Sequence, residues 1–283
     1  MKRFIKKIIK KLGLLHLAIN LYFKLKNFQN LKVYYCNKTP EMVTWAITGG
    51  CNSKCIFCEV PWQLNCKNDL SKEKVFEIID EMKAVGVKQV HLVGGEVFIR
   101  RDIFDILKYL KSKGISIYIT TNGLRFRFFS EEQLKIIKET VSTIAFSLDS
   151  TDKNQYEKIR GIPGCFDNML KAIRITKKLG SINIIIGAVV TKDTIPEIPK
   201  LVKLGAELGV DYVSFQPLSP ITIFAETRAK EDKINLMPKN KNDLENLTKY
   251  IDLGIKESKN KKIETSLSNF KTIAIPYFNS FME

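Results

Sequence analysis

The chain has 283 residues, of which 45% are hydrophobic and 10% aromatic, and only 9 are proline. This composition excludes a disordered or fibrous protein and supplies enough apolar material for one large α/β domain. The net charge is +16, but residues 1–40 hold ten Lys or Arg and no acid, which leaves +6 for the remaining 243 residues. A surplus that small is typical of solvated helix faces, so we do not expect nucleic acid to be a partner of the main domain.

Residues 1–26 predict a basic amphipathic helix. Apolar residues recur at helical spacing from Phe4 to Leu12, and basic residues occupy the positions between them. The apolar stretch 12–23 contains polar residues and is shorter than the ~20 residues that cross a bilayer. Two alternatives stay open for this segment: a surface helix packed on the domain, or reversible attachment to an anionic membrane surface.

From Met42 onward, short apolar runs alternate with longer amphipathic stretches, which is the pattern of repeated βα units. We expect strands at 42–48, 89–93, 116–121, 143–148, 183–190 and 212–216.

The helices between these strands have recognisable ends. Ser71 is the expected N-cap of the first, Gly86 follows its C-terminus, and Ser130 with Gln133 forms an expected capping box on another. Six βα units with right-handed crossovers predict an α/β fold in which a partial (β/α)6 TIM-like barrel binds ligands beyond the carboxyl ends of its strands.

The same reading divides the chain into three parts. We expect a basic amphipathic N-terminal segment over 1–40, a core barrel over 41–225 and a C-terminal helical extension over 226–283.

Three thiols follow the first expected strand in the spacing C-x3-C-x2-C: Cys51, Cys55 and Cys58. A [4Fe-4S] cluster held by three cysteines leaves one iron without a protein ligand, and that iron is free to bind a small chelating molecule. The alternative is a zinc site, which needs a fourth Cys or His at short spacing. His91 stands in an expected strand and His16 lies far upstream, so the motif favours the cluster.

This cysteine spacing, with Phe57 as the aromatic residue before the third cysteine, resembles the signature of the radical SAM superfamily. The resemblance implies two cofactors, a [4Fe-4S] cluster on the three cysteines and S-adenosylmethionine (SAM), whose amino and carboxylate groups chelate the open iron. It further implies reductive cleavage of SAM to a 5′-deoxyadenosyl radical, which abstracts a hydrogen atom from a substrate. Residues 42–220 carry the resemblance, and it is to the core of SPASM-type members.

Further segments resemble the family at the ends of the next strands. Gly94-Gly95-Glu96 resembles its GGE motif, in which the glutamate accepts a hydrogen bond from the SAM ammonium group. The segments 120–123 and 147–149 resemble its TNG and S-x-D segments. By this resemblance the residues that face the adenosyl group are Thr120, Asn122, Ser147 and Asp149.

Arg160-Gly161 resembles an Arg-Gly pair of the peptide-modifying branches, where the arginine pairs with the SAM carboxylate. Gln216, at the end of the sixth expected strand, is a weaker candidate for the cofactor site.

The C-terminus departs from those branches, because many of their members continue into a cysteine-rich extension that holds auxiliary clusters. No cysteine follows Cys165, and Cys36, Cys66 and Cys165 stand apart from one another in the sequence. We therefore expect these three to be isolated, small buried residues and expect no auxiliary cluster. A truncated copy of a longer protein would show the same departure.

The leading hypothesis is a cytoplasmic radical SAM enzyme, either fully soluble or peripheral to an anionic membrane through residues 1–26, that takes electrons from a ferredoxin or flavodoxin. A lipid-linked or membrane-associated substrate is one alternative, and a peptide or cofactor precursor is another. Two hypotheses of other classes are a non-catalytic iron-sulfur protein for electron transfer or sensing, and a nucleic-acid modifier that uses the basic segment.

Overall fold

The structure is a computed structural model that describes residues 40–58, 66–219 and 235–280. The expected N-terminal helix, its membrane attachment and Cys36 lie outside these residues. The chain divides into two compact units, residues 1–40 and residues 41–283, and the second holds all of the strands and helices described below.

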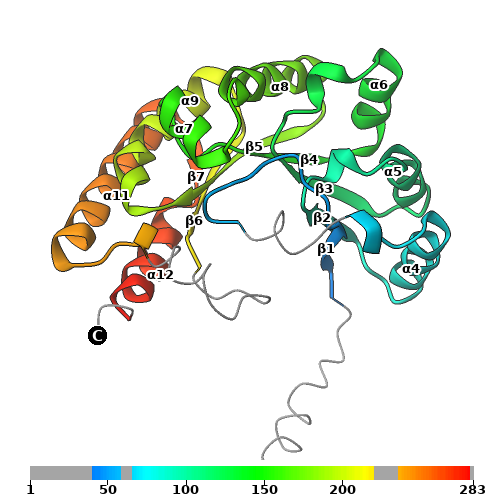
Figure 1. The fold of residues 1–283 in the computed structure, drawn as a ribbon, viewed down its shortest axis with the longest axis horizontal. Helices are drawn as coiled ribbons and strands as arrows, with labels where there is room; N and C mark the ends of the chain where they lie inside the picture. The colour runs from blue at the N-terminus through cyan, green and yellow to red at the C-terminus, as the bar shows by residue number, and fades with distance from the viewer. Residues whose placement is uncertain (1–39, 59–65, 220–234, 281–283) are drawn as a thin grey trace, which may run out of the picture. The chain divides into compact units, whose positions relative to one another are not determined.

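One parallel sheet with the strand order β1-β2-β3-β4-β5-β6-β7 forms the inner layer of the second unit (Figure 1). Its strands are β1 (Met42–Thr48), β2 (Gln89–Gly94), β3 (Ser116–Thr121), β4 (Thr143–Ser147), β5 (Asn183–Val190), β6 (Tyr212–Pro217) and β7 (Glu264–Thr265). The six expected strands are confirmed within one residue at each end. The two-residue β7 was not expected, because so short a segment has no measurable periodicity.

Helices follow the strands in alternation and lie on the convex side of the curved sheet, from α4 at one end to α11 at the other (Figure 1). The α-helices are α4 (Lys72–Ala84), α5 (Ile103–Ser112), α6 (Glu131–Thr140), α7 (Lys153–Arg160), α8 (Cys165–Leu179), α9 (Ile198–Leu208), α11 (Lys241–Lys261) and α12 (Leu267–Asn279). Short 3-10 helices are η1 (Cys66–Asn68), η2 (Val97–Ile99), η3 (Phe126–Phe128) and η4 (Lys192–Glu197). This is the expected α/β partial barrel.

The expected helix ends are confirmed by their hydrogen bonds. The Ser71 hydroxyl accepts from the Lys74 N–H at 3.3 Å, and Gly86 has the positive φ of 89° that the chain needs just beyond α4. Ser130 and Gln133 form the reciprocal capping box at the start of α6.

The two faces of the sheet differ because strand side chains alternate. On β2, Val90 and Leu92 are fully buried in the core against the helices, whereas His91 is only partly buried. The strand register aligns His91 with Tyr118 of β3, so these two side chains share the opposite face. We call this concave face, on which His91, Tyr118 and Thr120 lie, the lumen face.

The C-terminal helices complete the same unit. Helix α11 packs on α9 and α12, and Gly254 of α11 allows close contact with Ile198 of α9 and Leu267 of α12. Residues 241–279 therefore extend the barrel itself and do not form a separate unit. Among the helices of the described residues, none combines the length and the apolar character needed to cross a membrane.

Candidate cofactor site

The cysteine loop, residues 49–58, leaves the carboxyl end of β1 in a fixed direction. The Thr48 hydroxyl donates to Asp69 at 2.5 Å, the Gly49 N–H donates to the same carboxylate at 2.8 Å, and the Gly50 N–H donates to the Thr48 hydroxyl at 3.1 Å. Sequence reasoning missed Asp69, because no motif marks it. Its role arises only when the segment after η1 folds back onto β1.

Gly95 joins this loop to the end of β2. The Gly95 N–H donates to the Thr48 carbonyl at 2.9 Å, and the Glu96 N–H donates to the Gly50 carbonyl at 2.8 Å. A Cβ atom on Gly95 would overlap the carbonyl oxygen of Gly50. Only glycine allows this close approach of two backbones, which is the physical reason for a glycine here.

Glu96 is buried, and its carboxylate accepts three hydrogen bonds from the protein. The donors are the Phe98 N–H at 3.1 Å, the Thr121 hydroxyl at 2.7 Å and the Asn122 N–H at 2.7 Å. Burial raises the pKa of Glu96 above its ordinary value, although these donors oppose the shift. A carboxylate has about four lone-pair sites, so one acceptor position stays open for a ligand. Glu96 also has a structural role that was not expected, because its hydrogen bonds link the ends of β2 and β3.

Asn122 also connects elements instead of pointing into open space. Its side-chain NH2 group donates to Asn52 at 2.8 Å and to the Ser53 hydroxyl at 2.9 Å, and its side-chain oxygen accepts from the Leu124 N–H at 3.1 Å. Its amide therefore holds the cysteine loop against the end of β3. Neither Asn52 nor Ser53 was among the expected site residues.

The middle of the cysteine loop, from Lys54 to Ile56, is bonded to the C-terminal end of α7. The Lys54 N–H donates to the Arg160 carbonyl at 3.1 Å, and the Ile56 N–H donates to the Ile159 carbonyl at 2.9 Å. Gly161 follows with a φ of 68°, and a Cβ atom there would lie 2.7 Å from the Lys54 carbonyl oxygen. The cysteine loop therefore packs directly on the backbone of the expected Arg-Gly pair.

The Arg160 side chain is buried and contacts both Cys55 and Asp149. One guanidinium nitrogen, Nη1, donates to Cys55 Sγ at 3.6 Å, and the other, Nη2, lies 2.5 Å from Asp149 Oδ2. Asp149 in turn accepts from the Val189 N–H at 3.0 Å. The Phe57 ring centroid lies 5.7 Å from the guanidinium, so this aromatic residue covers the pair.

Three buried side-chain atoms have no hydrogen-bond partner among the described residues: Asp149 Oδ2, Glu157 Oε1 and Arg160 Nε. Although Asp149 Oδ2 is in ion-pair contact with Arg160, the geometry is not that of a hydrogen bond. Buried polar atoms are normally satisfied, and exceptions need an explanation. Arg160 Nε belongs to the guanidinium that contacts Cys55, so this unpaired donor fits a site that is completed by a polar ligand.

The three thiols of the loop affect one another electrostatically. Burial raises the pKa of Cys51 to about 11, and the neighbouring thiols Cys55 and Cys58 add to the shift. Burial also raises the pKa of Cys55, while the Arg160 guanidinium opposes the shift. A bound metal centre would supply the positive charge that keeps such thiols deprotonated. In the described ranges no three His, Cys, Asp or Glu residues lie close enough to hold a single metal ion.

Two expected residues, Ser147 and Gln216, have no recorded hydrogen bond to the cysteine loop among the described residues. Ser147 lies partly buried on β4, and its carbonyl accepts from the Tyr156 hydroxyl at 2.9 Å. Gln216 is exposed near the end of β6, beside Val189. Both stand at the carboxyl ends of their strands, as expected, but the structure records no hydrogen bond between either side chain and the other site residues.

The expectation for the remaining cysteines is half right. Cys165 is 2% exposed and belongs to the hydrophobic core. The expectation is wrong for Cys66, which is exposed and is not isolated from the loop: a Cβ atom on Gly50 would overlap the Cys66 sulfur. Cys66 follows residues 59–65 in the chain, and only the folding of η1 against β1 brings it there.

A polar group on the lumen face was missed by sequence reasoning, which considered His91 only as a zinc ligand. The rings of His91 and Tyr118 stack with centroids 3.9 Å apart, and His91 Nε2 lies 2.8 Å from the Thr120 hydroxyl. Burial lowers the pKa of His91, so its neutral form is favoured. The Thr120 hydroxyl therefore contacts His91 in this structure. The family resemblance predicts instead that Thr120 faces the adenosyl group.

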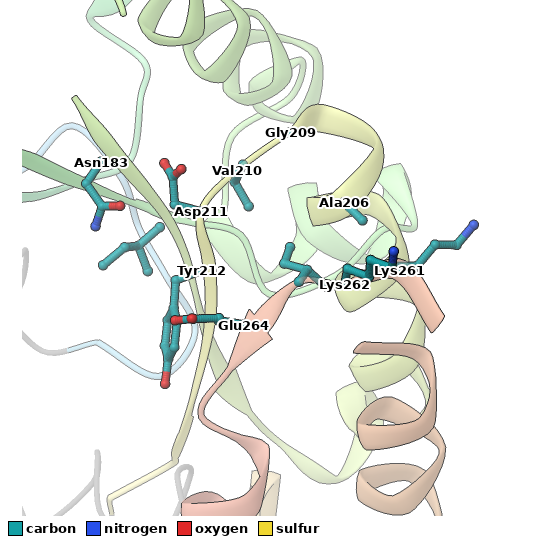
Figure 2. Close-up of a pocket in the computed structure, with 11 residues that line it drawn as sticks. Asn183, Ala206, Gly209, Val210, Asp211, Tyr212, Lys261, Lys262 and Glu264 are labelled. Atoms are coloured by element: carbon teal, nitrogen blue, oxygen red, sulfur yellow. The ribbon is translucent and has the colours of Figure 1, made fainter. Parts of the chain in front are cut away.

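A cavity of about 760 Å³ lies at the other end of the strands (Figure 2). Asn183, Tyr212 and Glu264 line it at the starts of β5, β6 and β7, and Figure 2 shows the Tyr212 and Glu264 side chains lying together. Ligands of such sheets bind at the carboxyl ends, where the cysteine loop lies. This cavity is therefore not the cofactor site.

Comparison with known proteins identifies the family and supports the assignment of the fold. The sequence profile described as "Radical SAM superfamily" matches residues 45–220. The chain is 29% identical over 171 residues to an AdoMet-dependent heme synthase of Methanosarcina barkeri, with 60% of this chain and 48% of that protein covered. It is 28% identical over 203 residues to a probable GTP 3',8-cyclase of Sulfurisphaera tokodaii, with 71% and 64% covered. The chain thus spans about half to two thirds of the length of these relatives.

A solved structure shares the fold. The crystal structure of Streptococcus suis SuiB bound to S-adenosylmethionine has a TM-score of 0.64 and 24% identity, with 90% of this chain and 59% of SuiB covered. Because the family profile covers more than half of the chain and includes all three cysteines of the loop, the protein belongs to the radical SAM superfamily, whose cofactors are a [4Fe-4S] cluster and SAM.

Proposed function

We propose that this protein is an enzyme that reductively cleaves SAM at a [4Fe-4S] cluster held by Cys51, Cys55 and Cys58. When bound, these cofactors would supply a 5′-deoxyadenosyl radical for hydrogen abstraction from a substrate. The observation that carries the proposal is the buried Arg160 side chain beside Cys55, whose Nε–H has no hydrogen-bond partner among the described residues. A purely structural loop would not need buried donors and acceptors without partners.

The chain's own residues would bind SAM from several sides. The open acceptor position of Glu96 suits an ammonium group, and the free Nε–H of Arg160 suits a carboxylate. The further proposed SAM-binding residues are Phe57, Gly94, Gly95, Thr120, Asn122, Ser147, Asp149 and Gln216. Among these, Asn122 and Asp149 would act through the elements that they hold in place, because Asn122 bonds to the cysteine loop and Asp149 pairs with Arg160.

We propose that the substrate enters the lumen of the partial barrel, where His91, Tyr118 and Thr120 provide a polar surface below the cofactor site. The named relatives make different products, so the likeness supports the chemistry and does not select among a lipid-linked, peptide or cofactor-precursor substrate. The electron donor would be a ferredoxin or flavodoxin. It would approach the exposed side chains of the cysteine loop, Asn52, Lys54 and Ile56.

Anaerobically reconstituted protein is expected to convert SAM to 5′-deoxyadenosine when dithionite is added. The test needs no knowledge of the substrate, because it detects the product of SAM cleavage itself. Chromatographic detection of 5′-deoxyadenosine measures the outcome, and the Cys55→Ala variant is the matched control. A protein that holds a reducible cluster but forms no 5′-deoxyadenosine would instead be the non-catalytic electron-transfer or sensor protein.

SAM affinity is expected to fall when either proposed contact is removed. Loss of a hydrogen bond to a charged group costs about 1.5–3 kcal/mol. The dissociation constant for SAM is therefore expected to rise roughly 10- to 150-fold in Glu96→Ala or Arg160→Ala. Equilibrium binding of SAM to reconstituted variants with intact cluster absorbance measures the change. Because Glu96 also links β2 to β3, the conservative Glu96→Gln variant shows how much of the effect is structural. Wild-type affinity in both alanine variants would remove these residues from the site.

A further inference from the structure

The ion pair of Arg160 and Asp149 has a position that SAM binding alone does not explain. Arg160 Nη1 donates to the sulfur of Cys55, one of the three proposed cluster ligands, at 3.6 Å. Arg160 Nη2 pairs with Asp149 at 2.5 Å, and the two side chains are only 10% and 0% exposed. A cation and an anion are thus buried together, with the cation against a ligand sulfur.

The surroundings fix this pair in one arrangement. Asp149 accepts from the Val189 N–H of β5 at 3.0 Å, while the Arg160 carbonyl accepts from the Lys54 N–H of the cysteine loop at 3.1 Å. The ring centroids of Phe57 and Tyr156 each lie 5.7 Å from the guanidinium. The pair is held at both ends and flanked by aromatic rings, so water screens its charges weakly.

Charges in such a place act on a redox centre. Reduction of an iron-sulfur cluster adds one negative charge, so a nearby cation or a hydrogen bond to a ligand sulfur stabilises the reduced form and raises the reduction potential. A nearby anion does the opposite. Because the guanidinium contacts Cys55 directly and the carboxylate lies behind it, the two groups have opposite effects of unequal size.

We propose that the Arg160–Asp149 pair sets the reduction potential of the cluster held by Cys51, Cys55 and Cys58: Arg160 raises the potential, and Asp149 limits the increase. This rests on the cluster of the proposed function but not on cleavage of SAM. Arg160 and Asp149 are positioning residues in this role, since they act through Cys55.

The test is an anaerobic potentiometric titration of the reconstituted full chain without SAM, followed by electron paramagnetic resonance of the reduced cluster. Arg160→Gln is expected to lower the potential and Asp149→Asn to raise it. The expected shifts are about tenfold in the reduced-to-oxidised ratio at a fixed potential, or about 59 mV for a one-electron couple. Arg160→Lys keeps the cation and is expected to restore part of the loss.

A control variant separates this effect from a general change of charge. Asp80→Asn removes an acid that pairs with Lys113 at 2.5 Å on the helical layer, and it is expected to leave the potential unchanged. Iron content and circular dichroism confirm that each variant holds its cluster and fold. If Arg160→Gln does not assemble the cluster, Asp149→Asn, which keeps the size of the side chain, decides the question.

Shifts of the same sign in Arg160→Gln and Asp149→Asn, or no shift in either, would overturn the proposal. Opposite shifts support it even if no 5′-deoxyadenosine is formed, in which case only the proposed SAM cleavage fails. Conversely, wild-type potentials in variants that still cleave SAM would leave the proposed function standing and remove this role of the pair.

Discussion

Replacement of any one of Cys51, Cys55 and Cys58 by alanine is expected to abolish the visible absorbance of the reconstituted cluster. Three thiolates are the fewest ligands that hold a [4Fe-4S] cluster with one open iron, so the loss of one leaves two irons without a protein ligand. Wild-type protein is expected to bind about four irons per chain, the content of one such cluster. Absorbance and iron analysis after anaerobic reconstitution measure both results.

The other cysteines provide matched controls. Cys36→Ala, Cys66→Ala and Cys165→Ala are expected to keep the absorbance; Cys165 is a core residue, and exposed Cys66 lies against Gly50. The Cys66 control is the most informative one, because its sulfur is close to the loop. An iron content near eight, or loss of the cluster in the Cys66 variant, would show that these cysteines take part in iron binding.

Gly95→Ala is expected to disrupt the cofactor site without altering any of the three proposed cluster ligands. The added methyl group would overlap the Gly50 carbonyl, so the end of β2 and the cysteine loop must separate and lose the Glu96 N–H to Gly50 hydrogen bond of 2.8 Å. Overpacking against backbone costs about 3 kcal/mol, which lowers Tm by roughly 6–12 °C in a domain of this size. We expect cluster content to fall with it.

Gly187→Ala is the control for this prediction. Gly187 lies on β5, the nearest atom to an added Cβ is the Phe146 carbonyl oxygen at 4.0 Å, and its φ is not in the left-handed region. Its cost is expected to stay within about 1 kcal/mol. Thermal unfolding and iron content compare the two variants. Wild-type Tm and full iron in Gly95→Ala would contradict the close approach of the two backbones.

The sequence by itself determined the features that depend on neighbouring residues. The βα alternation predicted six strands almost to the residue, because burial of one sheet face and one helix face forces a local period of two or 3.6. Ser71 and the Ser130–Gln133 box predicted helix starts, since a cap bonds within three residues of itself. The cysteine spacing predicted the cluster loop for the same reason: its ligands lie within one short segment.

Only the tertiary structure decided which distant residues meet. Arg160 and Cys55 are 105 positions apart, and Asp69 reaches Thr48 only after the chain folds back on β1. The family resemblance marked Asp149 as a residue that faces the adenosyl group, but not as the buried partner of Arg160. Such contacts depend on the packing of several elements at once, so the residues next to each partner in the sequence do not predict them. The lumen pair of His91 and Tyr118 was hidden likewise, because the register of β2 and β3 alone brings the rings together.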